Sequence, residues 1–173
     1  DRPSVTLFDA HGGREVVPLP LESQPRALAA GDGGLYVAAW TPPRLYHLRP
    51  DGRLIDVGPL PGRARVLAWT PRGLAFGGPD DPSLSILSFE HLEPTEVTRL
   101  PEPPVSAVRH GEHLYVGLDR RGEILKVGAG RAEVVARDLI TPRGLAVFNG
   151  ALHVAESLAH RITRLPAEVP RVD

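Results

Sequence analysis

The sequence predicts an all-β protein built from a tandem repeat of short strands. Four segments align on an anchor leucine, at spacings of 39, 40 and 38 residues: Leu35, Leu74, Leu114 and Leu152. The 19 prolines and 18 glycines interrupt the chain so often that no run of ten residues keeps a helical period. Four-stranded units that recur about every forty residues are typical of propeller blades. We therefore predict a β-propeller of four-stranded antiparallel blades, in preference to a β-sandwich, which needs no repeat.

The unit that contains Leu35 shows the four expected strands. They read RALAAGDG, LYVAAW, RLYHLRP and RLIDVGPL, and turn residues such as Asp51-Gly52 separate them. Asp-Gly between alternating runs indicates a hairpin, because a type I′ turn needs positive φ at both central positions. Within one repeat domain of residues 1–173, we expect blade-like units at 25–62, 63–103, 104–141 and 142–165, and N-terminal strands in 4–20.

The ends of the chain each supply part of a unit. The N-terminus provides two strands, three complete units follow, and the C-terminus provides three strands, which makes 17 strands in all. We favour a closed ring of four blades in which residues near Val5–Pro20 pair with residues near Arg143–Leu165, because closure removes exposed sheet edges. The alternatives are an open arc that self-associates with another copy, and a fragment of a six- to eight-bladed propeller.

The composition limits the possible partners. The formal net charge is −1 and aromatic residues make up 5%, which argues against nucleic-acid binding. No apolar run approaches the roughly 18 residues of a membrane span, so we expect no membrane insertion.

Several residue types are scarce. Cysteine and methionine are absent, Asn149 is the only asparagine, Gln24 the only glutamine and Lys126 the only lysine. This depletion, together with the preference for arginine, suggests a GC-rich thermophilic bacterium. The chain starts at Asp1, so we expect a processed form or an excised piece of a longer protein.

The last repeat, Thr141 to Leu165, resembles the NHL repeat. The residues that fit the pattern of that family are Pro142, Gly144, Ala146, Gly150, Val154, Ala155, Ser157, His160, Arg161 and Ile162. Glu156 stands where the pattern has Asp, and His153 stands where it has Tyr. The resemblance implies a propeller architecture rather than an activity. We also expect an extracytoplasmic module, periplasmic or secreted, of a bacterial protein.

Arginines recur just before the first strand of the units. Arg26, Arg65 and Arg143 occupy equivalent positions in the first, second and fourth repeats, and the third repeat has Val105 there. In a propeller these positions lie at the mouth of the central channel, so the three side chains form a candidate ligand-binding site for a small anion or an acidic segment of a partner protein. The alternative is that they are ordinary solvated or paired arginines in an arginine-rich chain.

Acidic residues lie in the loops on the same predicted face: Asp80, Asp81, Asp119 and Glu156. Propellers of the gluconolactonase type, which this chain resembles at the level of fold, hold a divalent cation there with carboxylates and an amide. Only Asp119 and Glu156 are candidates for such a metal site, and the repeats do not build a ring of carboxylates around them. The histidines have no spacing typical of a metal or catalytic motif, and no nucleophile elbow is present.

We therefore expect a non-catalytic binding or scaffold propeller with no catalytic residues and no cofactor. The alternative is an enzyme, a metal-dependent lactonase or a lyase of the gluconolactonase or streptogramin-lyase type.

Overall fold

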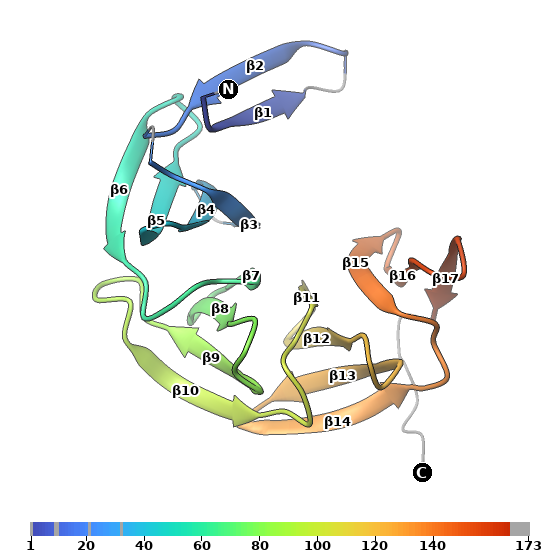
Figure 1. Cartoon of the computed structure of the whole chain (residues 1–173). Coiled ribbons are helices and arrows are strands. Elements are labelled where there is room, and N and C mark those ends of the chain that lie inside the picture. The colour runs from blue at the N-terminus through green and yellow to red at the C-terminus, as the bar shows by residue number, and fades with distance from the viewer. Residues whose placement is uncertain (1, 9–10, 21, 32, 167–173) are drawn as a thin grey trace. The chain divides into compact units, whose positions relative to one another are not determined.

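The protein is all-β, as predicted. The computed structural model describes residues 2–8, 11–20, 22–31 and 33–166, and every regular element in this part of the chain is a strand (Figure 1). No helix there is long and apolar enough to span a membrane. The chain divides into two compact units, Asp1–Ala64 (unit 1) and Arg65–Asp173 (unit 2).

Unit 1 contains a two-stranded and a four-stranded antiparallel sheet. The first consists of β1 (Ser4–Phe8) and β2 (Arg14–Pro18), and the second of β3 (Pro25–Gly31), β4 (Gly34–Trp40), β5 (Pro43–Leu48) and β6 (Leu54–Pro59). Val5 and Leu19 pack against Val37, Ala39 and Tyr46, so the β1–β2 hairpin covers one face of the sheet β3–β6.

Unit 2 contains three antiparallel sheets in chain order. The first consists of β7 (Val66–Thr70), β8 (Gly73–Gly77), β9 (Ser83–Leu87) and β10 (Pro94–Arg99). The second consists of β11 (Ser106–His110), β12 (His113–Leu118), β13 (Glu123–Gly128) and β14 (Arg131–Ala136). The third consists of β15 (Pro142–Phe148), β16 (Ala151–Glu156) and β17 (Arg161–Leu165). Among the first strands of these sheets, β11 lies beside both β7 and β15 (Figure 1).

The two central strands of the middle sheet, β12 and β13, are buried on both faces, and their alternating side chains contribute to two different clusters. In β12, Leu114 and Val116 pack towards the sheet β7–β10, whereas Tyr115 packs towards the sheet β15–β17. The middle sheet of unit 2 thus packs one face on the sheet before it and the other on the sheet after it, as expected of repeats that cannot bury their own faces.

The blade pattern agrees with the predicted repeat. The four anchor leucines lie in the second strands β4, β8, β12 and β16. Each of the four blade-like sheets runs in simple antiparallel order along the chain. The last blade has three strands, and β1 pairs with β2 in a sheet of their own. The mixed sheet of N-terminal and C-terminal strands that we expected is therefore not present among the described strands.

Candidate anion-binding site

Two of the three predicted arginines lie at β-bulges. In β3 the pairing with β4 shifts at Arg26, between Pro25 and Ala27, and in β15 the pairing with β16 shifts at Arg143, directly after Pro142. A proline cannot donate a ladder hydrogen bond, which makes bulges one of its few places in a sheet. The extra residue of a bulge bends the strand and re-aims the side chain. Both arginines are exposed.

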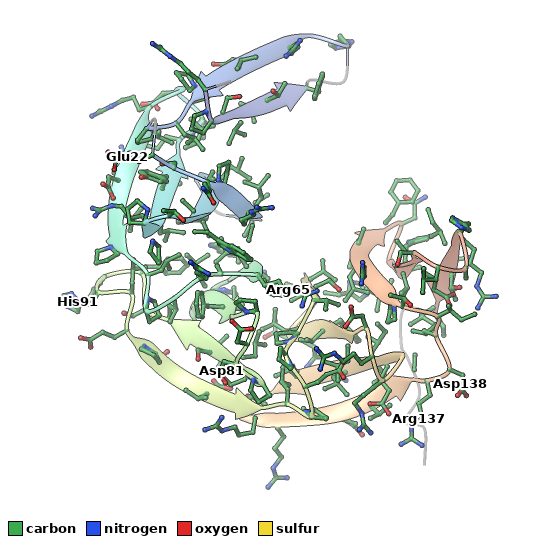
Figure 2. The ribbon with its side chains drawn as sticks, viewed as in Figure 1. Glu22, Arg65, Asp81, His91, Arg137 and Asp138 are labelled. Carbon is green, nitrogen blue, oxygen red and sulfur yellow. The ribbon has the colours of Figure 1, made fainter. Side chains whose placement is uncertain are left out.

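The other two repeats enter the first strand without a bulge. The backbone N–H of Arg65 donates to the carbonyl of Gly77 at 2.8 Å, and that of Val105 donates to Gly117 at 3.0 Å. These matching hydrogen bonds place Arg65 and Val105 at equivalent positions of successive blades. Arg65 lies directly before β7 in unit 2 (Figure 2).

In unit 2, the two arginines converge on one carboxylate. Arg143 Nε lies 3.3 Å and Arg65 Nη2 lies 3.9 Å from the same oxygen, Asp119 Oδ2. Asp119 follows the last residue of β12, and its side chain is only 14% exposed. Asp119 belongs to the middle blade of unit 2, which has Val105 at the position that arginine occupies in the two flanking blades. The acidic residue thus stands between the arginines of the two flanking blades.

The charges of this trio partly cancel. Two guanidinium groups and one carboxylate carry a net charge of +1 at neutral pH. Because water reaches both guanidinium groups, these ion pairs are screened and contribute only about 0–1 kcal/mol to stability. An incoming anion would compete with Asp119 for both guanidinium groups. The trio is therefore a weaker anion site than three unpaired arginines would make.

In unit 1, two arginines share one aromatic ring. The guanidinium carbon of Arg26 lies 5.1 Å and that of Arg63 lies 5.7 Å from the ring centroid of Trp40. Both arginines are exposed, and neither has an ion pair with a carboxylate among the described residues. A cation over an indole face is attracted by about 0.5–1 kcal/mol at an exposed site.

The backbone holds the Trp40 ring in place. Its Nε1–H donates to the carbonyl of Ala64, and its own backbone N–H donates to the carbonyl of Gln24 at 2.9 Å. Both acceptors lie in the chain that leads into or out of the sheet β3–β6. Because the indole is fixed, it limits the positions of the two guanidinium groups that lie over it.

The predicted trio of arginines is thus divided between the two units. Arg26 lies in unit 1 with Arg63, which we did not predict, and Arg65 and Arg143 lie in unit 2 with Asp119. A signal for both clusters was present in the sequence. Trp40 and Asp119 each stand five residues after their anchor leucine, so one repeat position gathers arginines in both units.

Glu156, one of the two weak metal candidates, is fully engaged in the fold. It accepts hydrogen bonds from Arg161 Nε at 2.7 Å, from Arg161 Nη2 at 3.0 Å, from the backbone N–H of Ile140 at 2.6 Å and from the Thr163 hydroxyl. The bonds from Arg161, then those from Ile140 and Thr163, lower the pKa of the Glu156 carboxyl to about 2. This carboxylate joins β16 to β17 and to the loop before β15.

The other acidic candidates also lack the arrangement of a metal site. Asp81 is exposed and lies 3.7 Å from Arg99, and Asp119 is bound by its two arginines. Within the described ranges, no three His, Cys, Asp or Glu side chains come together as metal ligands. Among the histidines, His47 stacks on Tyr36 at 4.4 Å between centroids, and half-buried His153 meets the ring of Phe148 edge-on.

In sequence, the chain matches no protein-family model and no curated protein. In three dimensions, it is similar to virginiamycin B lyase from Staphylococcus aureus, with a TM-score of 0.69 at 16% identity over 96% of this chain. It is also similar to a chain of a nidogen–laminin complex, with a TM-score of 0.67 at 15% identity over 91% of this chain and 70% of that one. A chain of the mitotic checkpoint complex matches with a TM-score of 0.69 at 11% identity, over 99% of this chain and 60% of that one.

The chain spans 64% of the length of the virginiamycin B lyase that it matches. At identities this low, structural similarity shows the fold and not the activity. The chain therefore has the β-propeller fold, which it shares with a lyase and with chains found in protein complexes.

Proposed function

We propose that the protein is a non-catalytic binding propeller that holds the carboxylate or phosphate oxygens of an acidic ligand between Arg26 and Arg63. The observation that carries this proposal is the pair of exposed guanidinium groups on Trp40, without a carboxylate partner among the described residues. The ligand is a small anion or an acidic segment of a partner protein.

The chemistry of the cluster suits such a ligand. A guanidinium group is planar, remains charged at every physiological pH and offers paired N–H donors to the two oxygens of a carboxylate or phosphate. Because the fixed indole restricts both side chains before the ligand arrives, less conformational entropy is lost on binding. We propose Arg65 and Arg143 as a second, weaker site, since Asp119 already occupies both.

Two further observations favour binding over catalysis. Similar chains occur in the nidogen–laminin and mitotic checkpoint complexes. The carboxylates that a metal-dependent lactonase or lyase would use as ligands, Asp119 and Glu156, are held by arginines instead. We also propose that the repeat is of the NHL type, because Glu156 and Arg161, which stand at two positions of that pattern, bind one another across β16 and β17.

The test is a calorimetric titration with sulfate, phosphate and citrate, and separately with a short polyglutamate peptide. Arg26→Ala and Arg63→Ala should each weaken binding by about ten- to a hundredfold, because a hydrogen bond to a charged group contributes about 1.5–3 kcal/mol. Affinity should also fall as the salt concentration rises, since the site is open to solvent. Binding of the peptide alone would identify an acidic partner segment as the ligand.

The matched control is Arg53→Ala, which removes an exposed arginine from the turn between β5 and β6. This variant should bind as the unchanged protein does. Thermal stability should change little in all three variants, because each loses at most an exposed contact. The proposal fails if no anion or peptide binds, or if Arg53→Ala weakens binding as much as the other two variants.

A further inference from the structure

One position of the repeat is buried in two sheets of unit 2 and exposed in the third. Leu84 in β9, Ile124 in β13 and Ile162 in β17 follow one another at spacings of 40 and 38 residues, as the anchor leucines do. Leu84 is 2% exposed and Ile124 is 0% exposed, whereas Ile162 is 71% exposed. An aliphatic side chain at this repeat position is therefore buried in the first two sheets of unit 2 and exposed in the third.

The covering in the first two sheets comes from the next sheet along the chain. Leu84 packs in one cluster with Leu125 of β13, and Ile124 packs in another with Leu152 and Val154 of β16. We call the face that packs on the next sheet the forward face, and the opposite one the rear face. Leu84 and Ile124 lie on forward faces, and Leu125 lies on a rear face.

The forward face of the sheet β15–β17 carries exposed apolar side chains beside Arg164, and no other sheet of unit 2 covers it among the described residues. Ala155 of β16 and Ile162 of β17 pair in register on it, and both are exposed. Phe148 of β15 is also exposed, and its ring meets His153, which alternation places on the same face. Contiguous exposed apolar side chains of this kind mark interaction surfaces.

The chain also exposes a rear face, on the β1–β2 hairpin. Val5 packs in a cluster with Val37 and Tyr46 of the sheet β3–β6, and its cross-strand neighbour Val17 is also buried, so both lie on the forward face of this hairpin. On the opposite face, Phe8 is 73% exposed and Val16 is 48% exposed. By the repeat, Leu7 corresponds to Leu45, Leu84 and Ile124, so Phe8 corresponds to Leu125.

We propose that the forward face of β15–β17 binds the rear face of the β1–β2 hairpin of a second copy of this chain. The proposed contact repeats one that unit 2 already contains, because Ile162 and Phe8 stand at the positions of Leu84 and Leu125, which share a buried cluster. Such a contact joins two different surfaces, so copies associate head to tail. The proposal is independent of the anion site.

The experiment measures self-association of the whole chain by sedimentation at increasing concentration. The unchanged protein should form dimers or larger species. Ile162→Lys and Phe8→Lys should each be monomeric, because each places an ammonium group in the apolar contact. Circular dichroism should show the same strand content in all variants, since both side chains are exposed. Val97→Lys, which changes an exposed valine of β10, is the control and should still associate.

Mixing the two variants distinguishes this specific contact from nonspecific association. Ile162→Lys keeps an intact Phe8 face, and Phe8→Lys keeps an intact Ile162 face. An equimolar mixture should therefore recover association and stop at one-to-one dimers. The proposal is overturned if the unchanged protein stays monomeric, if Val97→Lys is monomeric too, or if the mixture shows no association.

Discussion

Glu156 is a charged side chain that the fold buries almost completely, at 1% exposed. It avoids the cost of an unpaired buried charge because four hydrogen bonds reach its two oxygens. The sequence did not predict this role, since the partners Ile140, Arg161 and Thr163 are assembled only when β17 pairs with β16. The repeat aligns Asp119 with Trp40, but it did not indicate that Asp119 would hold Arg65 and Arg143, because these three residues lie in different blades.

Stability should depend on pH through Glu156. Its folded pKa of about 2 lies below the ordinary value of 4.5, so its contribution is fully present above about pH 4.5 and is lost as the pH falls towards 2. That contribution is roughly 3 kcal/mol, at 1.36 kcal/mol for each pKa unit. Glu156→Gln should therefore be destabilised at pH 7, and the gap to the unchanged protein should close near pH 2 in urea unfolding experiments.

The control for this measurement is Glu93→Gln, which changes an exposed carboxyl group in the β9–β10 loop. It should alter stability by a few tenths of a kcal/mol at most. A gap for Glu156→Gln that persists unchanged at pH 2 would show that shape, rather than charge, explains its effect.

Asp119→Asn should improve anion binding in unit 2. The change removes the carboxylate that competes for Arg65 and Arg143 and leaves a side chain of the same size. One charge at about 4 Å near the surface corresponds to about 1–4 kcal/mol before screening, so sulfate affinity should rise by about five- to tenfold. Calorimetry in the background of Arg26→Ala and Arg63→Ala isolates this site. An unchanged or weaker affinity would argue against an anion site at this cluster.

At the level of elements, the strands and their order were predicted well. The anchor leucines fall in β4, β8, β12 and β16 because alternating apolar runs between turn residues determine strands locally. The bulges at Arg26 and Arg143 were not predicted, although a proline precedes each one. A bulge depends on the register between two strands, and the pattern of a single strand does not contain that register.

Two hairpins require glycine at the first residue of their second strand, because the backbone of the third strand passes close to it. Gly34 opens β4 with φ 142° and Gly73 opens β8 with φ 149°. A Cβ atom at either site would overlap a carbonyl oxygen of the third strand, that of Leu48 or that of Leu87. The close approach of the backbones therefore excludes any side chain at these two positions.

Gly73→Ala should destabilise unit 2 by about 2 kcal/mol or more, since it combines a strained φ with a clash against backbone. For a chain of this size, that corresponds to a fall in Tm of about 4–8 °C. Gly128→Ala in β13 is the matched control, because a methyl group there would meet only His113 Nδ1, at 3.6 Å. Equal effects of the two substitutions in differential scanning calorimetry would refute this explanation.

At the scale of the whole molecule, the number of strands was predicted, and the structure has 17 in the described residues. The strands with which the N-terminal strands pair were not predicted correctly. Pattern and spacing identify a strand, but they do not identify the strand beside which it lies when the two are far apart in sequence. The N-terminal strands form the β1–β2 hairpin on the sheet β3–β6, and the last blade keeps three strands.

The stacking of the sheets in unit 2 follows from the repeat more directly. Because equivalent positions recur in each blade, each blade presents the same forward and rear faces. Leu84 and Ile124 are therefore buried by equivalent contacts, each with the next sheet along the chain. Each sheet then depends mainly on its immediate neighbours, as in other repeat proteins.

The protein contains two tryptophans, and each unit holds one of them. Trp40 lies under Arg26 and Arg63 in unit 1, and Trp69 lies under Arg109 in unit 2, 5.3 Å from the guanidinium carbon to the ring centroid. The indole emission of each unit can thus be separated by a single Trp→Phe substitution. With Trp69→Phe, the remaining fluorophore lies directly beneath the proposed ligand site, so the molecule carries its own optical probe of that site.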